Sequence, residues 1–299
     1  MSLTNTIIHF MLMKKRAFYN KQKPFDYNKR RQEEIQTEGS FKLPKTITIE
    51  NQSINGIPIE WIISQTNPKD KILYYIHGGG FVSGSSQARR RFTTYLASKI
   101  GYNVISVDYR LAPENPYPKG LDDCFRVYQS LHEIYGNENI FILGESAGGN
   151  LVLSCCLRIK DIYGKLPAGI GMFSPTLQYL ENFESYSKYI DKDCMVSNLH
   201  EEVIDIYFQT DDKDVLSHPY ASPLNGNFSG FCPVFLTVSD HEVLKDDAYS
   251  LKEMLEKENI KLEFIHRKGM VHAYMIIPDL SESKKDLKIL KRFIQSCFA

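Results

Sequence analysis

Ser146 is the centre of a Gly-x-Ser-x-Gly pattern that follows an apolar run at residues 140–143 and precedes a helix-forming run. A sharp turn from strand to helix forces its central residue into a strained backbone conformation and raises the side chain above the sheet. The flanking residues must be small, and Gly144 and Gly148 meet that need. The pattern predicts an exposed serine nucleophile beside a helix N-terminus, where developing negative charge is favoured.

A glycine-rich loop begins at His77, directly after the strand-like residues 72–76, and contains three consecutive glycines. Without side chains in the way, its backbone N–H groups can line a cavity and stabilise the charge of a tetrahedral intermediate. A phosphate-binding loop is the alternative, but no Gly-Lys-Ser/Thr follows and no Gly-x-Gly-x-x-Gly opens a helix here. The loop therefore predicts an oxyanion hole, with His77 holding the loop by a hydrogen bond and not acting as a base.

Of the eight histidines, His272 is the best placed to act as a general base. It follows a strand-like run at residues 262–266 and a short turn, so we expect it on a loop at the carboxyl edge of the sheet, level with Ser146. His266 lies within the strand-like run, and His241 lies beside the acidic candidates. In the chain order serine, acid, histidine, His272 is predicted to take the proton of Ser146.

The motifs together resemble those of the hormone-sensitive lipase family of α/β-hydrolases. The resemblance covers about residues 45–299 and rests on segments spread along nearly the whole chain. These segments are residues 77–81, 108–114, 144–150, 221–224, 242–247 and 271–273. One difference is that the nucleophile motif of the family usually has Asp or Thr where this chain has Glu145. The resemblance implies an α/β-hydrolase fold and serine-dependent ester hydrolysis.

The resemblance also implies the remaining site residues. It assigns the oxyanion donors to the backbone N–H groups of Gly79, Gly80 and Ala147. The family pattern for the acid segment, aligned without gaps, places the catalytic acid at Glu242. Asp240 lies two residues earlier and is the alternative acid, because either carboxylate can hold an imidazole in one tautomer.

Two further acidic residues follow the acid segment. Asp246 and Asp247 are expected to open the next helix, as a cap residue and a first-turn residue. They are therefore not predicted to take part in the chemistry.

The composition indicates one large α/β domain with an insertion, because 42% of the 299 residues are hydrophobic. The 36 basic and 36 acidic residues balance, so no nucleic-acid partner is expected. Six cysteines without a Cys-x-x-Cys pair predict neither a disulfide framework nor a zinc site, and reduced thiols suit a cytoplasmic protein. No cofactor or metal is expected. The expected partner is a small ester molecule, and a homodimer is left open.

Residues 1–44 are expected to form a helical, charged cap segment. The apolar residues near one helical face are Ile7, Ile8, Met11, Leu12 and Phe18. The apolar run at residues 7–13 is too short to span a bilayer, and its positive charges follow it, which is wrong for a signal peptide. We interpret the segment as a cap over the active site, without stable membrane insertion. Contact with a lipid surface is the alternative.

Residues 45–299 are predicted to form the catalytic domain. Two strand-like runs, at residues 45–49 and 58–63, make an opening hairpin around Asn55-Gly56. Six further strand-like runs alternate with helical runs, at residues 72–76, 103–107, 140–143, 169–173, 233–238 and 262–266. This alternation predicts a mostly parallel sheet with helices on both faces. Residues 179–217 break the alternation, hold a helical stretch at residues 199–208, and predict a second cap piece.

The sequence therefore predicts a cofactor-independent serine carboxylesterase that hydrolyses short- to medium-chain esters through an acyl-enzyme. An amide hydrolase of the formamidase type, on the same fold, is one alternative. A non-catalytic ligand-binding member of the fold is another, and it would predict an incomplete set of catalytic residues.

Overall fold

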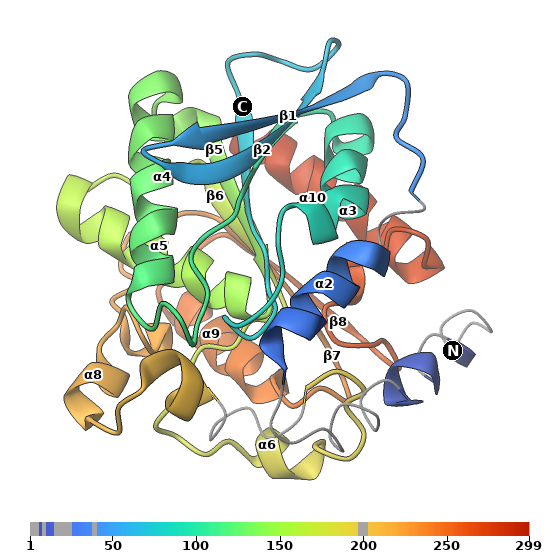
Figure 1. Cartoon of the computed structure of the whole chain (residues 1–299). Helices are drawn as coiled ribbons and strands as arrows, with labels where there is room; N and C mark the ends of the chain where they lie inside the picture. Colours follow the sequence, from blue (N-terminus) through green and yellow to red (C-terminus); the bar gives the residue numbers. More distant parts are fainter. Residues whose placement is uncertain (1–5, 8–9, 15–25, 38–40, 197–202, 299) are drawn as a thin grey trace.

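The computed structural model describes residues 6–7, 10–14, 26–37, 41–196 and 203–298 (Figure 1). Its centre is an eight-stranded sheet in the order β1-β2-β4-β3-β5-β6-β7-β8. The strands are β1 (Ile47–Ile54), β2 (Ile57–Ser64), β3 (Ile72–Ile76), β4 (Asn103–Val107), β5 (Ile140–Glu145), β6 (Gly169–Phe173), β7 (Val234–Ser239) and β8 (Leu262–Arg267).

Only the first hairpin departs from parallel pairing. β1 and β2 are antiparallel around the turn at Asn55-Gly56, and β2 is antiparallel to β4. From β4 to β8 every neighbouring pair is parallel. The predicted mostly parallel sheet is confirmed, and the hairpin strands are longer than predicted. Since parallel strands end at the same edge, the loops after β3, β5, β6, β7 and β8 meet there.

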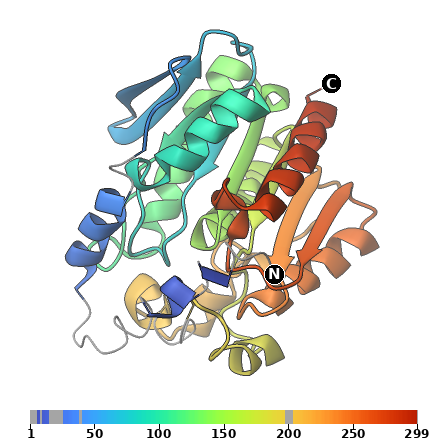
Figure 2. The ribbon, with the colours of Figure 1, turned by 90° about the vertical axis from the view of Figure 1, so that its right-hand side faces the viewer.

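Helices cover both faces of the sheet (Figures 1 and 2). α4 (Lys119–Tyr135), α5 (Ala147–Tyr163) and α9 (Lys245–Lys257) pack their apolar residues into one buried cluster. α3 (Arg90–Tyr95) and α10 (Ser281–Cys297) pack into a second cluster. The strands serve both clusters because successive side chains point to opposite faces; in β3, Tyr74 belongs to the first and Tyr75 to the second.

The predicted insertion at residues 179–217 lies between β6 and β7. It contains the short helices α6 (Glu184–Lys188) and α8 (Lys213–Ser217) and one π-helical turn, η4 (Ile204–Phe208), which are grouped at one end of the sheet (Figure 1). Residues 197–202 lie outside the described residues, and they include 199–202, the first part of the predicted helical stretch. The ring of Tyr207 stacks on that of Phe81 with centroids 3.8 Å apart, so the insertion contacts the glycine-rich loop.

The N-terminal segment contributes α2 (Tyr27–Thr37). Of the apolar residues predicted on one face, Ile8 and Phe18 lie outside the described residues. Ile7 and Met11 are exposed, whereas Leu12 packs against the second core cluster. No helix in the described ranges has the length and apolarity needed to cross a membrane.

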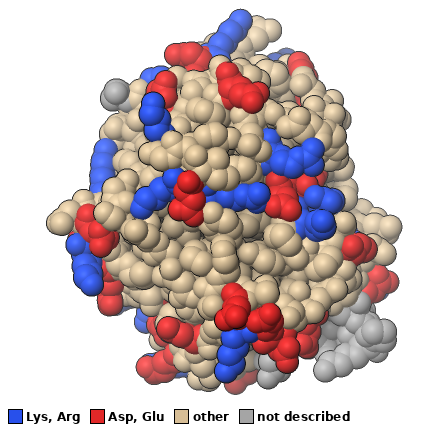
Figure 3. Space-filling model, turned by 90° about the vertical axis from the view of Figure 1, so that its left-hand side faces the viewer, with Lys and Arg blue, Asp and Glu red and all other residues tan. Residues whose placement is uncertain are grey.

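Acidic and basic side chains are interspersed on the face in Figure 3. This distribution agrees with the balanced charge of the whole chain.

Candidate active site

Ser146 occupies the turn between β5 and α5, where the strand ends at Glu145 and the helix begins at Ala147. Its φ and ψ of 54° and −122° are strained for a residue with a side chain, as the sequence pattern predicted. A Cβ on Gly144 would lie 2.6 Å from the Gly148 carbonyl oxygen, so the turn admits only glycine there. The Ser146 N–H donates to the Phe173 carbonyl at 2.9 Å, which fixes the turn against the end of β6.

His272 and Glu242 form a buried pair on the loops after β8 and β7. His272 Nδ1 lies 2.7 Å from Glu242 Oε2, and the two residues are 4% and 1% exposed. The other carboxylate oxygen, Oε1, accepts the Ser239 N–H at 2.7 Å and the Ser174 hydroxyl at 2.9 Å. Among the described residues, His272 Nε2 has no hydrogen-bond partner. The pair therefore presents an oriented imidazole whose second nitrogen is available to accept a proton.

Ser174 joins the parts of the site, and the sequence analysis missed it. Its hydroxyl donates to Glu242 and accepts the Ala273 N–H at 3.1 Å, so it bridges the acid loop and the base loop. Ser174 directly follows Phe173, the residue that receives the Ser146 N–H. Its position just after a buried strand was the available signal, because side chains there gather at the carboxyl edge of a parallel sheet.

Burial and charge act in opposite directions on His272. Burial alone would lower the pKa of its imidazole, but the hydrogen bond and negative charge of Glu242 outweigh this, and the pKa lies above its ordinary value of 6.5. Burial raises the pKa of the Glu242 carboxyl, and its hydrogen bonds with His272 and Ser174 oppose that rise. The imidazole is thus prepared to accept a proton.

We expect kcat/KM to decrease as pH falls through an apparent pKa above 6.5. A general base acts in its neutral form, and a raised pKa keeps His272 protonated, hence inactive, up to a higher pH. A pH–rate profile from about pH 5 to pH 9 measures this limb. His241→Gln serves as the control and should leave the limb in place. A limb at or below 6.5 would contradict the raised pKa, and a profile without an acid limb would contradict the assignment of His272 as the base.

Asp240, the alternative acid, has a different contact. Its Oδ1 accepts the Gly269 N–H at 2.7 Å, which holds the turn that precedes His272. Among the described residues, Asp240 makes no hydrogen bond or ion pair with His272.

Asp247, predicted to open a helix, lies in the first turn of α9 but is fully buried. It accepts the Leu177 N–H at 2.6 Å and the Tyr186 hydroxyl at 2.8 Å. Burial raises the pKa of this carboxyl to about 7. Asp247 therefore connects α9 to the segment after β6 and to Tyr186 of the insertion, a role beyond that of a helix-terminal residue.

The oxyanion loop, residues 77–81, follows β3. Gly79 and Gly80 have φ of +125° and +63°, which L side chains rarely adopt. The His77 Nδ1 lies 2.9 Å from the Gly78 carbonyl, and burial lowers the pKa of His77, so this ring is a neutral donor that holds the loop. Within the described part of the chain, the N–H groups of Gly79, Gly80 and Ala147 donate to no acceptor.

Glu145, the unusual residue of the nucleophile motif, is 1% exposed and points away from solvent. Its carboxylate accepts the Gly78 N–H at 2.8 Å, the Arg89 Nε–H at 2.8 Å and the Tyr75 hydroxyl. The residue beside the nucleophile thus holds the oxyanion loop through the Gly78 N–H.

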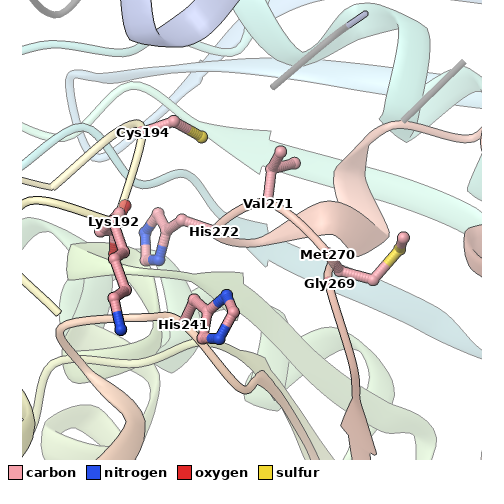
Figure 4. A pocket seen from close by; sticks show the side chains of 8 residues that line it. Lys192, Cys194, His241, Gly269, Met270, Val271 and His272 are labelled. Carbon is pink, nitrogen blue, oxygen red and sulfur yellow. The ribbon is translucent and has the colours of Figure 1, made fainter. Parts of the chain in front are cut away.

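A small hollow of about 30 Å³ lies beside His272, among residues shown in Figure 4. Lys192, Cys194, His241 and Met270 lie around it. Its volume admits only a water molecule or two, so it is not a space for an acyl chain. The described residues include no cluster of His, Cys, Asp or Glu side chains that could hold a metal ion.

Comparisons with known proteins agree with the fold. A family profile described as alpha/beta hydrolase fold matches residues 73–276. An esterase of Acinetobacter venetianus is 32% identical over 86% of this chain and 84% of its own length. An acetyl-hydrolase of Streptomyces hygroscopicus is 26% identical over 79% of each chain. The crystal structure of an esterase from the bacterial hormone-sensitive lipase family covers 100% of both chains, with a TM-score of 0.89 and 27% identity.

Proposed function

This chain belongs to the hormone-sensitive lipase family of α/β-hydrolases, and we propose that it hydrolyses short- to medium-chain carboxylic esters through an acyl-enzyme. The observation that carries the proposal is the His272–Glu242 pair, 2.7 Å apart, whose Nε2 is unpartnered among the described residues. Ser146 stands on the same edge of the sheet, at a strained turn. An oriented base and an elevated serine are the parts that nucleophilic acyl transfer requires.

In the proposed reaction, Ser146 Oγ attacks the ester carbonyl while His272 Nε2 takes the hydroxyl proton. The N–H groups of Gly79, Gly80 and Ala147 stabilise the oxyanion that forms. The intermediate collapses as His272 gives its proton to the leaving alcohol. A water molecule, deprotonated by His272, then attacks the acyl-enzyme. The second intermediate collapses as the bond to Ser146 Oγ breaks and His272 returns the proton to that oxygen, which releases the acid and restores the serine.

Substrate size is part of the proposal. We expect esters with acyl chains of about two to eight carbons to be the best substrates, because each buried methylene contributes ~0.8 kcal/mol only until the pocket is full. The acetyl-hydrolase among the relatives supports a short acyl group. A series of p-nitrophenyl esters of increasing chain length measures kcat/KM directly. Rates that keep rising to emulsified long-chain triglycerides would contradict the proposal and favour a lipase.

Reaction class is tested with matched substrates. Butyrate presented as an ester, an anilide and a lactone holds the acyl group nearly constant while the leaving group changes. We expect the ester to be turned over fastest. A faster anilide would favour amide hydrolysis of the formamidase type, and turnover of none would favour a ligand-binding protein.

The remaining parts of the proposal concern the surroundings of the enzyme. We propose a small ester as the partner and a cytoplasmic location. All six cysteines are free, and five of them are buried, which suits a reducing compartment.

A further inference from the structure

Helix α2 packs against the segment that follows the oxyanion loop, and Glu34 makes the central contact. Its carboxylate accepts the Gly84 N–H at 2.9 Å and the Ser83 hydroxyl at 3.1 Å. Arg30, one turn earlier, pairs with the same carboxylate at 3.1 Å. The Glu34 side chain is only 15% exposed, so these contacts are shielded from solvent.

Ser83 controls the peptide unit between Gly79 and Gly80. The Gly79 carbonyl accepts the N–H groups of Val82 at 3.2 Å and Ser83 at 3.0 Å, and the Ser83 hydroxyl lies 3.1 Å away. In a trans peptide the carbonyl and the following N–H point in opposite directions. The donors that hold the Gly79 carbonyl therefore set the direction of the Gly80 N–H.

Gly84 controls the preceding peptide unit. It has φ of +93°, and a Cβ there would lie 2.2 Å from the Gly78 carbonyl oxygen and 2.4 Å from His77 Nδ1. Gly84 is thus in direct contact with the peptide whose N–H belongs to Gly79. By holding Ser83 and Gly84, Glu34 acts on both peptide units that carry oxyanion donors from this loop.

Glu145 holds the same loop at a second point, because its carboxylate accepts the Gly78 N–H. Arg89 lies between the two carboxylates: it donates to Glu145, and its positive charge lowers the pKa of Glu34. Burial alone would raise that pKa, but Arg30 and Arg89 together outweigh it, so Glu34 remains an anionic acceptor.

Arg31 fixes α2 in place for this contact. Its guanidinium donates to the Val82 carbonyl at 2.8 Å and the Ala112 carbonyl at 2.7 Å. It also pairs with both oxygens of Glu114, at 2.9 and 2.8 Å. The helix is therefore attached both to Val82, just after the oxyanion loop, and to Ala112, whose N–H donates to the Phe81 carbonyl at 3.0 Å.

We propose that Glu34 is a positioning residue for the oxyanion hole, which orients the N–H groups of Gly79 and Gly80 through Ser83 and Gly84. The inference rests on the proposed ester hydrolysis. It assigns the N-terminal helix a part in transition-state stabilisation, in addition to any part in enclosing the substrate.

The expected effect on kcat and KM follows from the step at which the Gly79 and Gly80 N–H groups act. They stabilise the oxyanion of the transition state more than the neutral carbonyl of the substrate, so their misalignment lowers kcat with little change in KM. A displacement of about 1 Å in the groups that position the reacting atoms can lower the rate about 10²-fold. If Glu34 served only to enclose the substrate, its replacement would instead raise KM.

The experiment compares Glu34→Ala and Glu34→Gln with Gln32→Ala, an exposed position on the same helix. For Glu34→Ala we expect kcat for p-nitrophenyl butyrate to fall about 10- to 100-fold, with KM within about twofold. Affinity for a trifluoromethyl ketone, which forms an oxyanion on Ser146, should fall in parallel. Glu34→Gln retains an acceptor for the Gly84 N–H and should recover part of kcat, and Gln32→Ala should match the wild type.

Thermal unfolding and circular dichroism of each variant separate positioning from loss of fold. A folded Glu34→Ala with wild-type kcat, or with only a raised KM, overturns the inference while leaving ester hydrolysis in place. Equal losses of substrate and ketone affinity also overturn it, because the donors would then not act selectively on the oxyanion. A wild-type protein without ester turnover overturns the proposed function itself, which keeps the two failures distinct.

Discussion

Replacing Ser146 by alanine is expected to abolish ester turnover, with a loss in kcat of about 10⁵-fold or more, while the fold is retained. The reason is that Ser146 supplies the hydroxyl at the strained turn, on the same edge of the sheet as the unpartnered Nε2 of His272 among the described residues. Alanine retains the Cβ and hence the same backbone strain, and the change removes only the hydroxyl, so Ser146→Ala should not be less stable than the wild type by more than about 1 kcal/mol.

Labelling provides the direct measurement. A fluorophosphonate probe should modify the wild type stoichiometrically, with the mass shift on the peptide that contains Ser146. Ser187→Ala, at an exposed position on α6, serves as the control and should label and turn over as the wild type does. Labelling at another serine, or full activity of Ser146→Ala, would refute the assignment of the nucleophile.

Glu242→Gln is expected to lower kcat by between about 10²- and 10⁴-fold, as the equivalent amide substitution does in a serine protease. The structure gives a specific reason. Glu242 Oε1 accepts the Ser239 N–H at 2.7 Å, and a backbone donor cannot reverse its role. The glutamine must therefore place its oxygen there and its NH₂ toward His272 Nδ1. That arrangement moves the imidazole proton to Nε2, where it prevents His272 from accepting the proton of Ser146.

Asp240→Asn is the matched comparison, because it removes a charge two residues away. Asparagine retains an oxygen for the Gly269 N–H, so we expect turnover within about threefold of the wild type. Both variants are measured near neutral pH, after circular dichroism has verified the fold. A severe defect in Asp240→Asn together with nearly normal Glu242→Gln would make Asp240 the acid.

The turn at Ser146 and the oxyanion loop could be predicted because their constraints are local. A Cβ on Gly144 would meet the Gly148 carbonyl, four residues along the chain, so spacing alone carries that requirement. Gly148 is also required by the approach of the Ile76 and His77 carbonyls, which only the fold brings there. The alternation of apolar strands with helices likewise predicted the parallel sheet. Parallel strands end at one edge, which is why His272 could be expected near Ser146.

The residues that hold the loops of the site in place by hydrogen bonds could not be predicted in this way. Ser174 bridges Glu242 and Ala273 across separations of 68 and 99 residues, and Glu34 reaches Gly84 across 50. No periodicity marks such residues, because one serine or glutamate resembles another until the chain is folded. Asp247 is a similar case: its place at a helix start was visible, and its buried contact with Leu177 was not.

The sequence by itself therefore determined the chemistry and the class of scaffold, since the Gly-x-Ser-x-Gly spacing and the alternation of apolar strands with helices are patterns of neighbouring residues. Only the tertiary structure decided the order of the strands in the sheet. It also decided which side chains hold that chemistry in place. Glu145 accepts the N–H of Gly78 in the oxyanion loop, and Glu34 accepts that of Gly84, three residues after the loop. Every residue except proline offers such a group, so the choice of partner is made by packing and not by residue type.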